Sequence, residues 1–423
     1  MTLRDRLIRL LRWSEKYTKT DMVYLFTAGA WTNFDLAIQS VLSLLLSVAL
    51  ANTLAPAAYG LYQYLVAIAG LVAAVSLSGM NIAVTQAVAR GYEGVLRASV
   101  RIQLRWAIVP AILSAAGALY YFTQAQPGIG LGLVAIALFT PLVQTFNTYV
   151  AFLDGKQEFR AFFFLRLVAN LVYYAAMFAA LPFIRSGALF IVINVIASAA
   201  GNFYAYRATL RRFKPNDKVD PAALSYGKHL SILNGFSAAM SQLDSVLVFH
   251  FLGAAPLAIY SLATLIPERV AGFFTFVELA SLPKFANSPL AYIRANLIGK
   301  IGRLALAGII VAVCYALAAP LLFHLLFPAY ARAIPFTQGY AAIIAIGGVT
   351  SLSQITLYAK RFTREIYVFS IVQPILLVGL QIPLLLTYGI WGMVVARLIS
   401  GTIGIALSLW FTYHPLAPPL ADA

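Results

Sequence analysis

The sequence predicts an all-α integral membrane protein with twelve transmembrane helices in two six-helix lobes related by a parallel repeat, both termini being cytoplasmic. Three observations predict this fold class. The 423 residues are 61% hydrophobic and only 10% charged, whereas soluble domains carry about 25% charged residues. Apolar runs of membrane-spanning length recur along the chain, and basic residues gather in alternate connections. The net charge of +16 is therefore attributed to basic cytoplasmic loops, and we expect no nucleic acid partner.

The N-terminal segment, residues 1–24, is predicted to be an interfacial helix on the cytoplasmic leaflet. It lacks the apolar core and the small-residue cleavage site of a signal peptide. An amphipathic basic helix binds an anionic membrane surface. The alternative is a frayed, solvated tail. The two faces of the predicted helix carry Leu3, Leu7, Leu10 and Leu11 on one side and Arg4, Arg9, Arg12 and Lys16 on the other.

Twelve apolar runs follow this segment. A helix needs about 20 apolar residues to cross the hydrocarbon of a bilayer. The predicted spans are residues 32–51, 59–79, 104–122, 130–149, 162–181, 187–206, 229–252, 257–282, 304–327, 336–357, 366–386 and 390–413.

Lysine and arginine give the orientation of these spans. With the N-terminus inside, all but four of the 30 Lys and Arg residues are assigned to the cytoplasmic side. The exceptions are Arg185 and Arg332 on outer loops and Arg269 and Arg397 within spans. Because an error of one helix would scramble this asymmetry, the positive-inside rule favours twelve spans with both termini in the cytoplasm.

A polar, basic connection divides the chain into two halves. Residues 207–228 are predicted to be a cytoplasmic linker between an N-terminal lobe, residues 25–206, and a C-terminal lobe, residues 229–413, which a cytoplasmic tail follows at 414–423. One constant offset along the chain matches Leu54 with Leu252 and Tyr62 with Tyr260. Two halves with the same even number of spans start on the same side, as in the parallel repeats of two-lobed transporters.

Polar residues form stripes on the predicted first, seventh and eighth helices. Spacings of three or four residues place each stripe on one helical face. Facing lipid, such stripes would be unstable, so we expect them to line an aqueous central cleft between the lobes. The candidate residues for binding substrate or a coupling ion are Asp35, Gln39, Asn234, Asp244, Tyr260, Glu268, Arg269, Glu278 and Arg397.

We expect the charged residues of this set, more than the uncharged ones, to be functional. An ionisable residue inside a membrane is by default functional, whereas a single Ser or Thr there is more often a packing or hydrogen-bonding residue. Glu268 and Arg269 are adjacent in LATLIPERVAGFF and point about 100° apart on a helix, so they do not pair with each other. The alternative for Glu278 and Arg397 is a structural ion pair between helices.

The sequence lacks the usual residues of catalytic and metal sites. Cys314 is the only cysteine, which excludes a disulfide framework or a cysteine metal site. The four histidines show no HExxH-like spacing, and no phosphate loop or nucleophile triad is found. We therefore expect a protein that is not an enzyme, with no catalytic residue, no metal site and no cofactor apart from a coupling H⁺ or Na⁺.

Three stretches carry a family resemblance: LANTLAPAAYGLYQYLVAIAGLVAAVSLSGMNIAVTQAVAR at residues 50–90, FLDGKQEFR at 152–160 and TYGIWGMVVARLIS at 387–400. They resemble the polysaccharide flippase family, the O-antigen and exopolysaccharide branch of the multidrug/oligosaccharidyl-lipid/polysaccharide exporter superfamily. The resemblance implies a multi-pass protein of the bacterial inner membrane that moves polyprenyl-pyrophosphate-linked oligosaccharide to the outer leaflet by alternating access. The product would be a surface polysaccharide such as lipopolysaccharide O-antigen or exopolysaccharide. The implied partners are lipid-linked oligosaccharide, membrane lipids and other polysaccharide assembly proteins.

This resemblance also implies roles for basic residues, because a pyrophosphate needs Arg or Lys along its path. Arg269 and Arg397 are the buried candidates, and Arg90 and Lys284 are the candidates at the cytoplasmic mouth. Since the stripes are net acidic, an acidic residue such as Asp35 has the alternative role of carrying a coupling H⁺ or Na⁺ or of binding a cationic substrate.

Three other functions stay open. The main alternative is a cation-coupled multidrug exporter of the same superfamily. A peptidoglycan lipid flippase is a second alternative, although such proteins usually carry helices beyond twelve. A membrane glycan polymerase or ligase is disfavoured, because such an enzyme needs a large outer loop or domain and the predicted outer loops are short.

Overall fold

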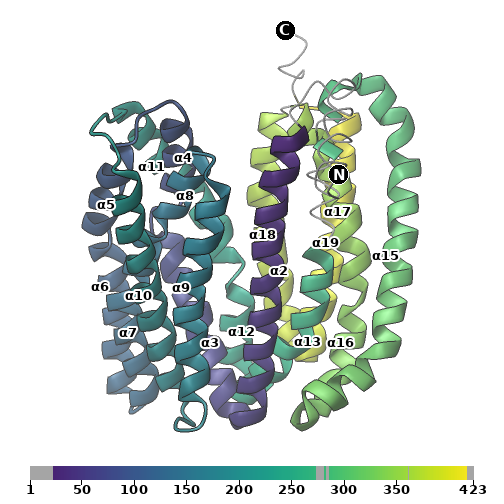
Figure 1. The fold of residues 1–423 in the computed structure, drawn as a ribbon. Coiled ribbons are helices and arrows are strands. Elements are labelled where there is room, and N and C mark those ends of the chain that lie inside the picture. The colour runs from purple at the N-terminus through teal and green to yellow at the C-terminus, as the bar shows by residue number, and fades with distance from the viewer. Residues whose placement is uncertain (1–21, 273–280, 283–284, 361, 417–423) are drawn as a thin grey trace, which may run out of the picture. The chain divides into compact units, whose positions relative to one another are not determined.

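The computed structural model describes residues 22–272, 281–282, 285–360 and 362–416, and these residues form helices joined by short connections, with no strand among them (Figure 1). The helices of the first half are α2 (Met22–Thr53), α3 (Pro56–Val75), α4 (Met80–Ala89), α5 (Val95–Trp106), α6 (Ile108–Thr123), α7 (Pro127–Phe146), α8 (Thr148–Gly155), α9 (Phe159–Ala180) and α10 (Gly187–Phe213). Those of the second half are α11 (Pro221–Met240), α12 (Leu243–Leu252), α13 (Ala254–Gly272), α15 (Leu290–Leu326), the 3₁₀ helix η1 (Pro328–Ala333), α16 (Ile334–Tyr340), α17 (Ala342–Ala359), α18 (Thr363–Tyr388) and α19 (Ile390–Tyr413).

Eleven helical stretches among the described residues are long and apolar enough to cross a membrane. Each overlaps one of the predicted spans, which confirms the all-helical membrane fold. The remaining predicted span, 257–282, overlaps α13 and continues into residues 273–280, which lie outside the described residues. The count of twelve and the cytoplasmic termini therefore stay predictions, and the interfacial helix predicted at 1–24 falls mostly on residues 1–21, also outside them.

Large apolar side chains on α6 and α15 point away from the protein interior. On α15, Leu317, Leu321 and Leu325 recur every fourth residue and are each more than 70% exposed. On α6, Ile112 and Leu119 are more than 60% exposed. Water would disfavour such continuous apolar faces, whereas the hydrocarbon of a bilayer solvates them. These faces are the lipid-contacting surface expected of membrane-spanning helices.

Several spans are broken helices. The second predicted span continues to Gly79, but α3 ends at Val75 and the chain resumes as α4 at Met80. At the break, the Ser76 hydroxyl donates to the carbonyl of Val72 at 3.1 Å. A Cβ on Gly79 would lie 2.4 Å from the backbone nitrogen of Ser231, so only glycine permits this close approach. Comparable breaks separate α5 from α6, α7 from α8 and α16 from α17.

The chain divides into two compact units. Unit 1 comprises residues 1–49, 72–184 and 189–235, and unit 2 comprises residues 50–71, 185–188 and 236–423. Among the described residues of unit 1, a large core surrounds Tyr149 and Phe152 of α8, which are fully buried. The described residues of unit 2 include three smaller cores, which contain Leu297, Ile344 and Phe362.

Helix boundaries recur along the chain. Helix α2 ends at Thr53 and α3 begins at Pro56; α12 ends at Leu252 and α13 begins at Ala254. These are the positions at which the sequence repeat matches Leu54 with Leu252. The recurrence agrees with a repeat of the same helical unit in each half of the chain.

The residues predicted to form the linker are partly helical. Helix α10 continues to Phe213 and α11 begins at Pro221, so only residues 214–220 connect them. This connection is attached to the turn before α5. The Asn216 side chain donates to the carbonyl of Gly91 at 3.1 Å, and the Gly94 N–H donates to the carbonyl of Lys218 at 2.9 Å.

Candidate functional site

Unit 2 contains a buried cluster centred on Asp244 of α12, which is 3% exposed. Arg397 of α19 donates to Asp244 Oδ2 through Nε at 2.8 Å and also through Nη2. Gln381 of α18 donates to Oδ1 at 2.9 Å, and the Tyr260 hydroxyl of α13 donates to Oδ2 at 3.0 Å. Three helices therefore direct polar groups at one carboxylate on a fourth, which satisfies the requirement that a buried charge be paired and hydrogen-bonded.

Glu268 lies at the exposed edge of this cluster. Its side chain is 48% exposed, and its Oε1 lies 3.9 Å from Nη2 of Arg397. The Tyr340 hydroxyl of α16 donates to the same oxygen at 3.0 Å. Two carboxylates thus share one guanidinium, so the cluster of Asp244, Glu268 and Arg397 carries one excess negative charge when both acids are ionised. Glu268 is the solvent-accessible acid of this cluster.

Unit 1 contains a second buried carboxylate, Asp35 of α2, which is 3% exposed. Its Oδ2 lies 3.4 Å from Nη1 of Arg166 on α9 and accepts a hydrogen bond from Gln39 at 2.6 Å. Gln39 also accepts from Arg166 at 3.5 Å. The acid that sequence analysis placed in the cleft stripe of the first helix is therefore neutralised within unit 1.

A cavity of about 270 Å³ lies beside this pair in unit 1. It is bounded by α2, α7, α8, α9 and α10 together with the break at Asn147. Its lining is mostly amide and phenol groups: Gln39, Val143, Gln144, Asn147, Tyr149, Arg166, Ala169, Asn170, Tyr173, Tyr174, Ser198 and Asn202. Such a lining offers both hydrogen-bond donors and acceptors, with aromatic faces between them.

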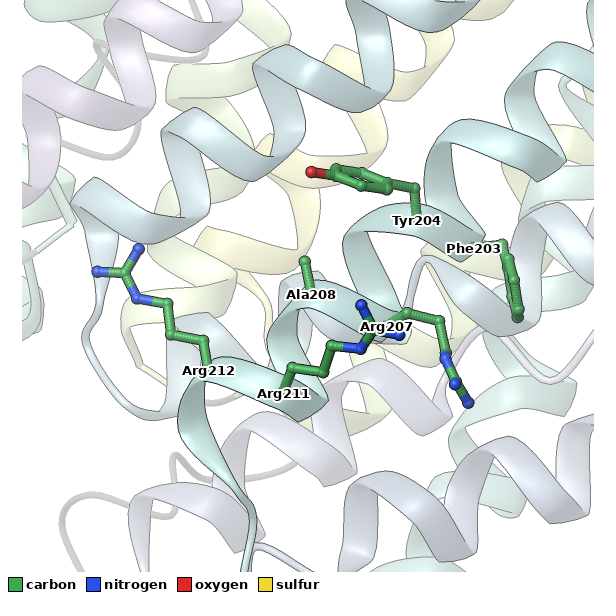
Figure 2. Close-up of a pocket in the computed structure, with 6 residues that line it drawn as sticks. All are labelled: Phe203, Tyr204, Arg207, Ala208, Arg211 and Arg212. Carbon is green, nitrogen blue, oxygen red and sulfur yellow. The ribbon is translucent and has the colours of Figure 1, made fainter.

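A basic groove of about 640 Å³ lies at the carboxyl-terminal part of α10. Figure 2 shows the six residues that line it, Phe203, Tyr204, Arg207, Ala208, Arg211 and Arg212, all projecting from this helix. The three arginines are exposed, and none of them forms an ion pair with another residue that the structure describes. We call this surface the α10 groove. Clustered guanidinium groups of this kind favour phosphate-type anions.

The sequence-predicted residues separate into these clusters. Asp244, Tyr260, Glu268 and Arg397 come together in unit 2, and Asp35 and Gln39 come together in unit 1. Asn234 of α11 is exposed and Arg269 of α13 is partly buried. Glu278 and Lys284 lie outside the described residues. The structure does not test the predicted roles of these residues, so the roles stay predictions.

Arg90, predicted to contact pyrophosphate at the cytoplasmic mouth, lies directly after α4 and is 57% exposed. Its Nη2 lies 2.9 Å from Oδ2 of Asp220, so its charge is partly compensated. Nearby, Glu93 pairs with Lys156 at 2.5 Å and accepts the N–H of Asn216 at 3.1 Å. Burial alone would raise the pKa of Glu93, but the Lys156 hydrogen bond, the Asn216 N–H and the Lys156 charge outweigh it and hold that pKa below its usual value.

Sequence reasoning missed three residues of these sites: Arg166, Gln381 and Tyr340. Arg166 was grouped with the loop before the fifth span, whereas it lies within α9. Its apolar surroundings in FFFLRLVAN resemble those of Arg397 in MVVARLIS, and this similarity was a usable signal. Gln381 and Tyr340 are uncharged, so only their tertiary contacts identify them.

Among the described residues, no group of three or more His, Cys, Asp or Glu side chains is arranged to hold a metal ion.

Comparison with known proteins gives a family and a fold. The family described as "Polysaccharide biosynthesis protein" matches residues 34–288. No curated protein matches the sequence.

Solved structures with the same fold are transporters by title. The lipid II flippase MurJ in an inward closed conformation is 16% identical, with a TM-score of 0.62, covering 94% of this chain and 89% of that chain. An inward-facing multidrug resistance MATE family transporter of the MOP superfamily is 13% identical, with a TM-score of 0.63, covering 89% of this chain and 100% of that chain. A variant of the Vibrio cholerae MATE transporter VcmN is 14% identical, with a TM-score of 0.55, covering 92% and 95%. At these identities the likeness concerns the fold.

Proposed function

Because the chain belongs to the polysaccharide biosynthesis protein family, we propose that it is a flippase that moves polyprenyl-pyrophosphate-linked oligosaccharide across the bacterial inner membrane. It does so by alternating access, as expected of the fold that it shares with MurJ and MATE transporters. The product feeds the synthesis of a surface polysaccharide, such as lipopolysaccharide O-antigen or exopolysaccharide. Membrane lipids and other polysaccharide assembly proteins are its proposed partners.

One observation favours this substrate over a cationic drug: the two buried aspartates of the candidate clusters, Asp35 and Asp244, are paired with arginine. Asp35 pairs with Arg166 and Asp244 pairs with Arg397. A cationic substrate that used either acid would have to displace a guanidinium already held by it. Uncharged sugar hydroxyls need no such exchange, because they hydrogen-bond to amides, phenols and paired ions alike.

The α10 groove supports an anionic headgroup as the second part of the substrate. Arg207, Arg211 and Arg212 are exposed and lack ion pairs within the described part of the chain. Arg90, by contrast, already pairs with Asp220. A pyrophosphate gains charge-assisted hydrogen bonds from free guanidinium groups. We therefore propose the α10 groove as a first contact for the pyrophosphate on the side from which it is taken up, with Arg90 contributing after release from Asp220.

A cation-coupled multidrug exporter is the second candidate, and Glu268 is the observation that favours it. This acid is about half exposed and shares Arg397 with Asp244, so it can take up H⁺ or Na⁺. The same property serves a flippase, in which Glu268 would carry the coupling ion. The two functions therefore differ in the substrate bound rather than in the coupling residue.

Binding measured by native mass spectrometry separates the two. The probes are a polyprenyl-pyrophosphate oligosaccharide and tetraphenylphosphonium, each offered to the purified full chain. We expect retention of the lipid-linked oligosaccharide. In the Arg207→Ser/Arg211→Ser double variant its binding should weaken by at least about tenfold, since losing even one charged hydrogen bond costs about 1.5–3 kcal/mol. Arg303→Ser, at another exposed arginine, is the matched control and should bind normally. Retention of tetraphenylphosphonium alone would favour the exporter.

A further inference from the structure

We propose that the cavity of unit 1 is a subsite for one uncharged sugar unit of the transported glycan. This inference rests on the proposed function and adds the part of the substrate that this cavity selects. The cavity lies wholly within unit 1, so its lining is set by the packing of α2, α7, α8, α9 and α10 alone. Four properties of the lining carry the inference: unused hydrogen-bonding groups, an unpartnered phenol, neutral charge and size.

Unused hydrogen-bonding groups line the cavity. The side chains of Gln144, Asn147, Asn170 and Ser198 make no hydrogen bond to any other residue that the structure describes. Each amide offers two donor hydrogens and an acceptor oxygen, and the serine offers one donor and an acceptor. All four side chains are partly exposed, so water satisfies them when no ligand is bound. A ligand that replaces this water must itself both donate and accept hydrogen bonds, as sugar hydroxyls do.

Tyr149 is a second, independent indication. It is fully buried, lines the cavity, and its hydroxyl has no hydrogen-bond partner among the described residues. Burying a hydroxyl without a partner is unfavourable. A ligand hydroxyl in the cavity would satisfy it. The neighbouring ring of Tyr174, also buried, offers an apolar face suited to the C–H groups of a pyranose.

The charge of the site selects against ions. Among the described residues that line the cavity, Arg166 is the only charged one, and its charge is compensated by Asp35 at 3.4 Å. A pyrophosphate in the cavity would have to compete with Asp35 for Arg166, and a cation would meet a guanidinium. An uncharged polar ligand meets neither penalty.

The size of the cavity limits the ligand to a single unit. Its volume is about 270 Å³, at the small end of ligand pockets, which span about 300–1,000 Å³. A monosaccharide fits this space and a whole oligosaccharide does not. The cavity is therefore assigned to one sugar residue, while the remainder of the glycan and the pyrophosphate lie elsewhere.

Protection of a cysteine in the cavity tests the assignment. Ser198→Cys is introduced with Cys314→Ala, and the full chain is placed in lipid nanodiscs, because glycoside detergents carry the chemistry being tested. Methyl methanethiosulfonate labels the thiol with and without the methyl glycosides of glucose, galactose, mannose and N-acetylglucosamine. Sodium pyrophosphate and tetraphenylphosphonium serve as charged competitors. We expect at least one glycoside to slow labelling several-fold and neither ion to do so.

Two variants connect protection to the lining residues. Tyr149→Phe and Asn147→Ala should each raise the glycoside concentration needed for protection by about five- to tenfold, the loss of one hydrogen bond. Gln86→Ala, an exposed amide of unit 1 outside the cavity, should leave it unchanged. Thermal unfolding gives a second readout: the protecting glycoside should raise the Tm of the wild-type chain but much less that of Tyr149→Phe. That variant should itself unfold no earlier than wild type, because it loses only an unpartnered hydroxyl.

Several outcomes would overturn the subsite: no glycoside slows labelling or raises the Tm, an ion protects as well as a sugar, or both variants keep full protection. If the glycosides fail while the lipid-linked oligosaccharide is still retained in native mass spectrometry, the subsite alone is wrong. If a glycoside protects while the lipid-linked oligosaccharide is not retained, the proposed flippase function is wrong and the sugar site stands.

Discussion

Asp244 and Asp35 are acidic residues on membrane-spanning helices, and each is stabilised there by pairing with an arginine. Asp244 has partners on three other helices, Tyr260, Gln381 and Arg397. Removing two charges from water costs several kcal/mol per ion, and their attraction repays this only with good geometry and extra hydrogen bonds. The Asp244 cluster meets both conditions. Its main effect is to fix α12, α13, α18 and α19 in one register.

Breaking the Asp244 pair from one side should be costly. Arg397→Met leaves the carboxylate buried without its guanidinium, and we expect it to lower the free energy of unfolding by about 3–5 kcal/mol. The double variant Asp244→Asn/Arg397→Met removes both charges and should recover at least half of that loss. Thermal unfolding in nanodiscs measures both. Arg332→Met, at an exposed arginine, is the control and should change stability by no more than about 0.5 kcal/mol. Equal losses in the single and double variants would show that the pair does not act as a unit.

The sequence predicted which acidic residues belong to the candidate sites, but not which residues pair with them. Asp35, Asp244 and Glu268 stood out because charge inside an apolar run is rare. Their partners did not, because Arg166 and Gln381 lie more than a hundred residues away along the chain and reach the acids only through helix packing. The amides of the unit 1 cavity could not be predicted for the same reason, since Asn147 lies at the break between α7 and α8 and Asn170 lies on α9.

At the scale of elements, the connection 214–220 is a docked segment of unit 1. Arg90 pairs with Asp220, Arg97 with Asp217, and Glu93 accepts the N–H of Asn216. Gly94 permits the close approach, because a Cβ there would lie 2.8 Å from the carbonyl oxygen of Lys218. Glu93 is central, since it also pairs with Lys156 after α8. One carboxylate thus holds the connection, the turn before α5 and the end of α8 together.

This contact should depend on pH with a defined sign. The pKa of Glu93 is held below its usual value. Its stabilisation is therefore complete above its unfolded pKa of about 4.3 and is lost as pH falls through the lower, folded pKa. Hydrogen exchange at the Asn216 amide should stay slow, relative to its intrinsic rate, down to about pH 4 and become faster below it. The matched comparison is Glu93→Gln. In this variant the Asn216 amide should be less protected from exchange at pH 7, and its protection should show no transition with pH. Equal protection in both chains at neutral pH would contradict this account.

The membrane spans were predicted well, because length and hydropathy determine them. Breaks within the spans were predicted less well, because they depend on local chemistry. Eleven of the predicted spans overlap a helical stretch long and apolar enough to cross a membrane, because apolar runs of bilayer length have few alternatives. The breaks at Ser76 and Asn147 were not predicted. An apolar run continues through both positions, and a break costs little when neighbouring helices supply polar partners. The turn at Gly389, with a φ of 59°, lies between the predicted spans 366–386 and 390–413, where the glycine-containing TYGIWG motif had placed the start of the last helix.

For the whole molecule, the number of spans decides the topology. Residues 273–280 lie outside the described residues, so the predicted span 257–282 is the one that needs a direct test. Twelve spans place residue 184 outside and residues 216 and 284 inside. An odd count that omitted this span would put 216 and 284 on opposite sides of the membrane.

Single-cysteine labelling in whole cells tests this topology. With Cys314→Ala as background, Ile184→Cys should react with a membrane-impermeant maleimide. Asn216→Cys and Lys284→Cys should react only after permeabilisation, because both are predicted to face the cytoplasm. Labelling of Lys284→Cys in intact cells would remove the predicted eighth span. Labelling of Asn216→Cys there would reverse the assigned orientation.

Flipping in proteoliposomes tests the flippase assignment most directly. Liposomes contain a fluorescent polyprenyl-pyrophosphate oligosaccharide, and a membrane-impermeant quencher reports the fraction in the outer leaflet over time. We predict that the wild-type chain equilibrates the probe between leaflets, while Arg207→Ser/Arg211→Ser slows it and protein-free liposomes do not exchange it. A chain that leaves the probe in its original leaflet but exports a cationic dye along a proton gradient, with loss of export in Glu268→Gln, would contradict the flippase assignment and identify a multidrug exporter.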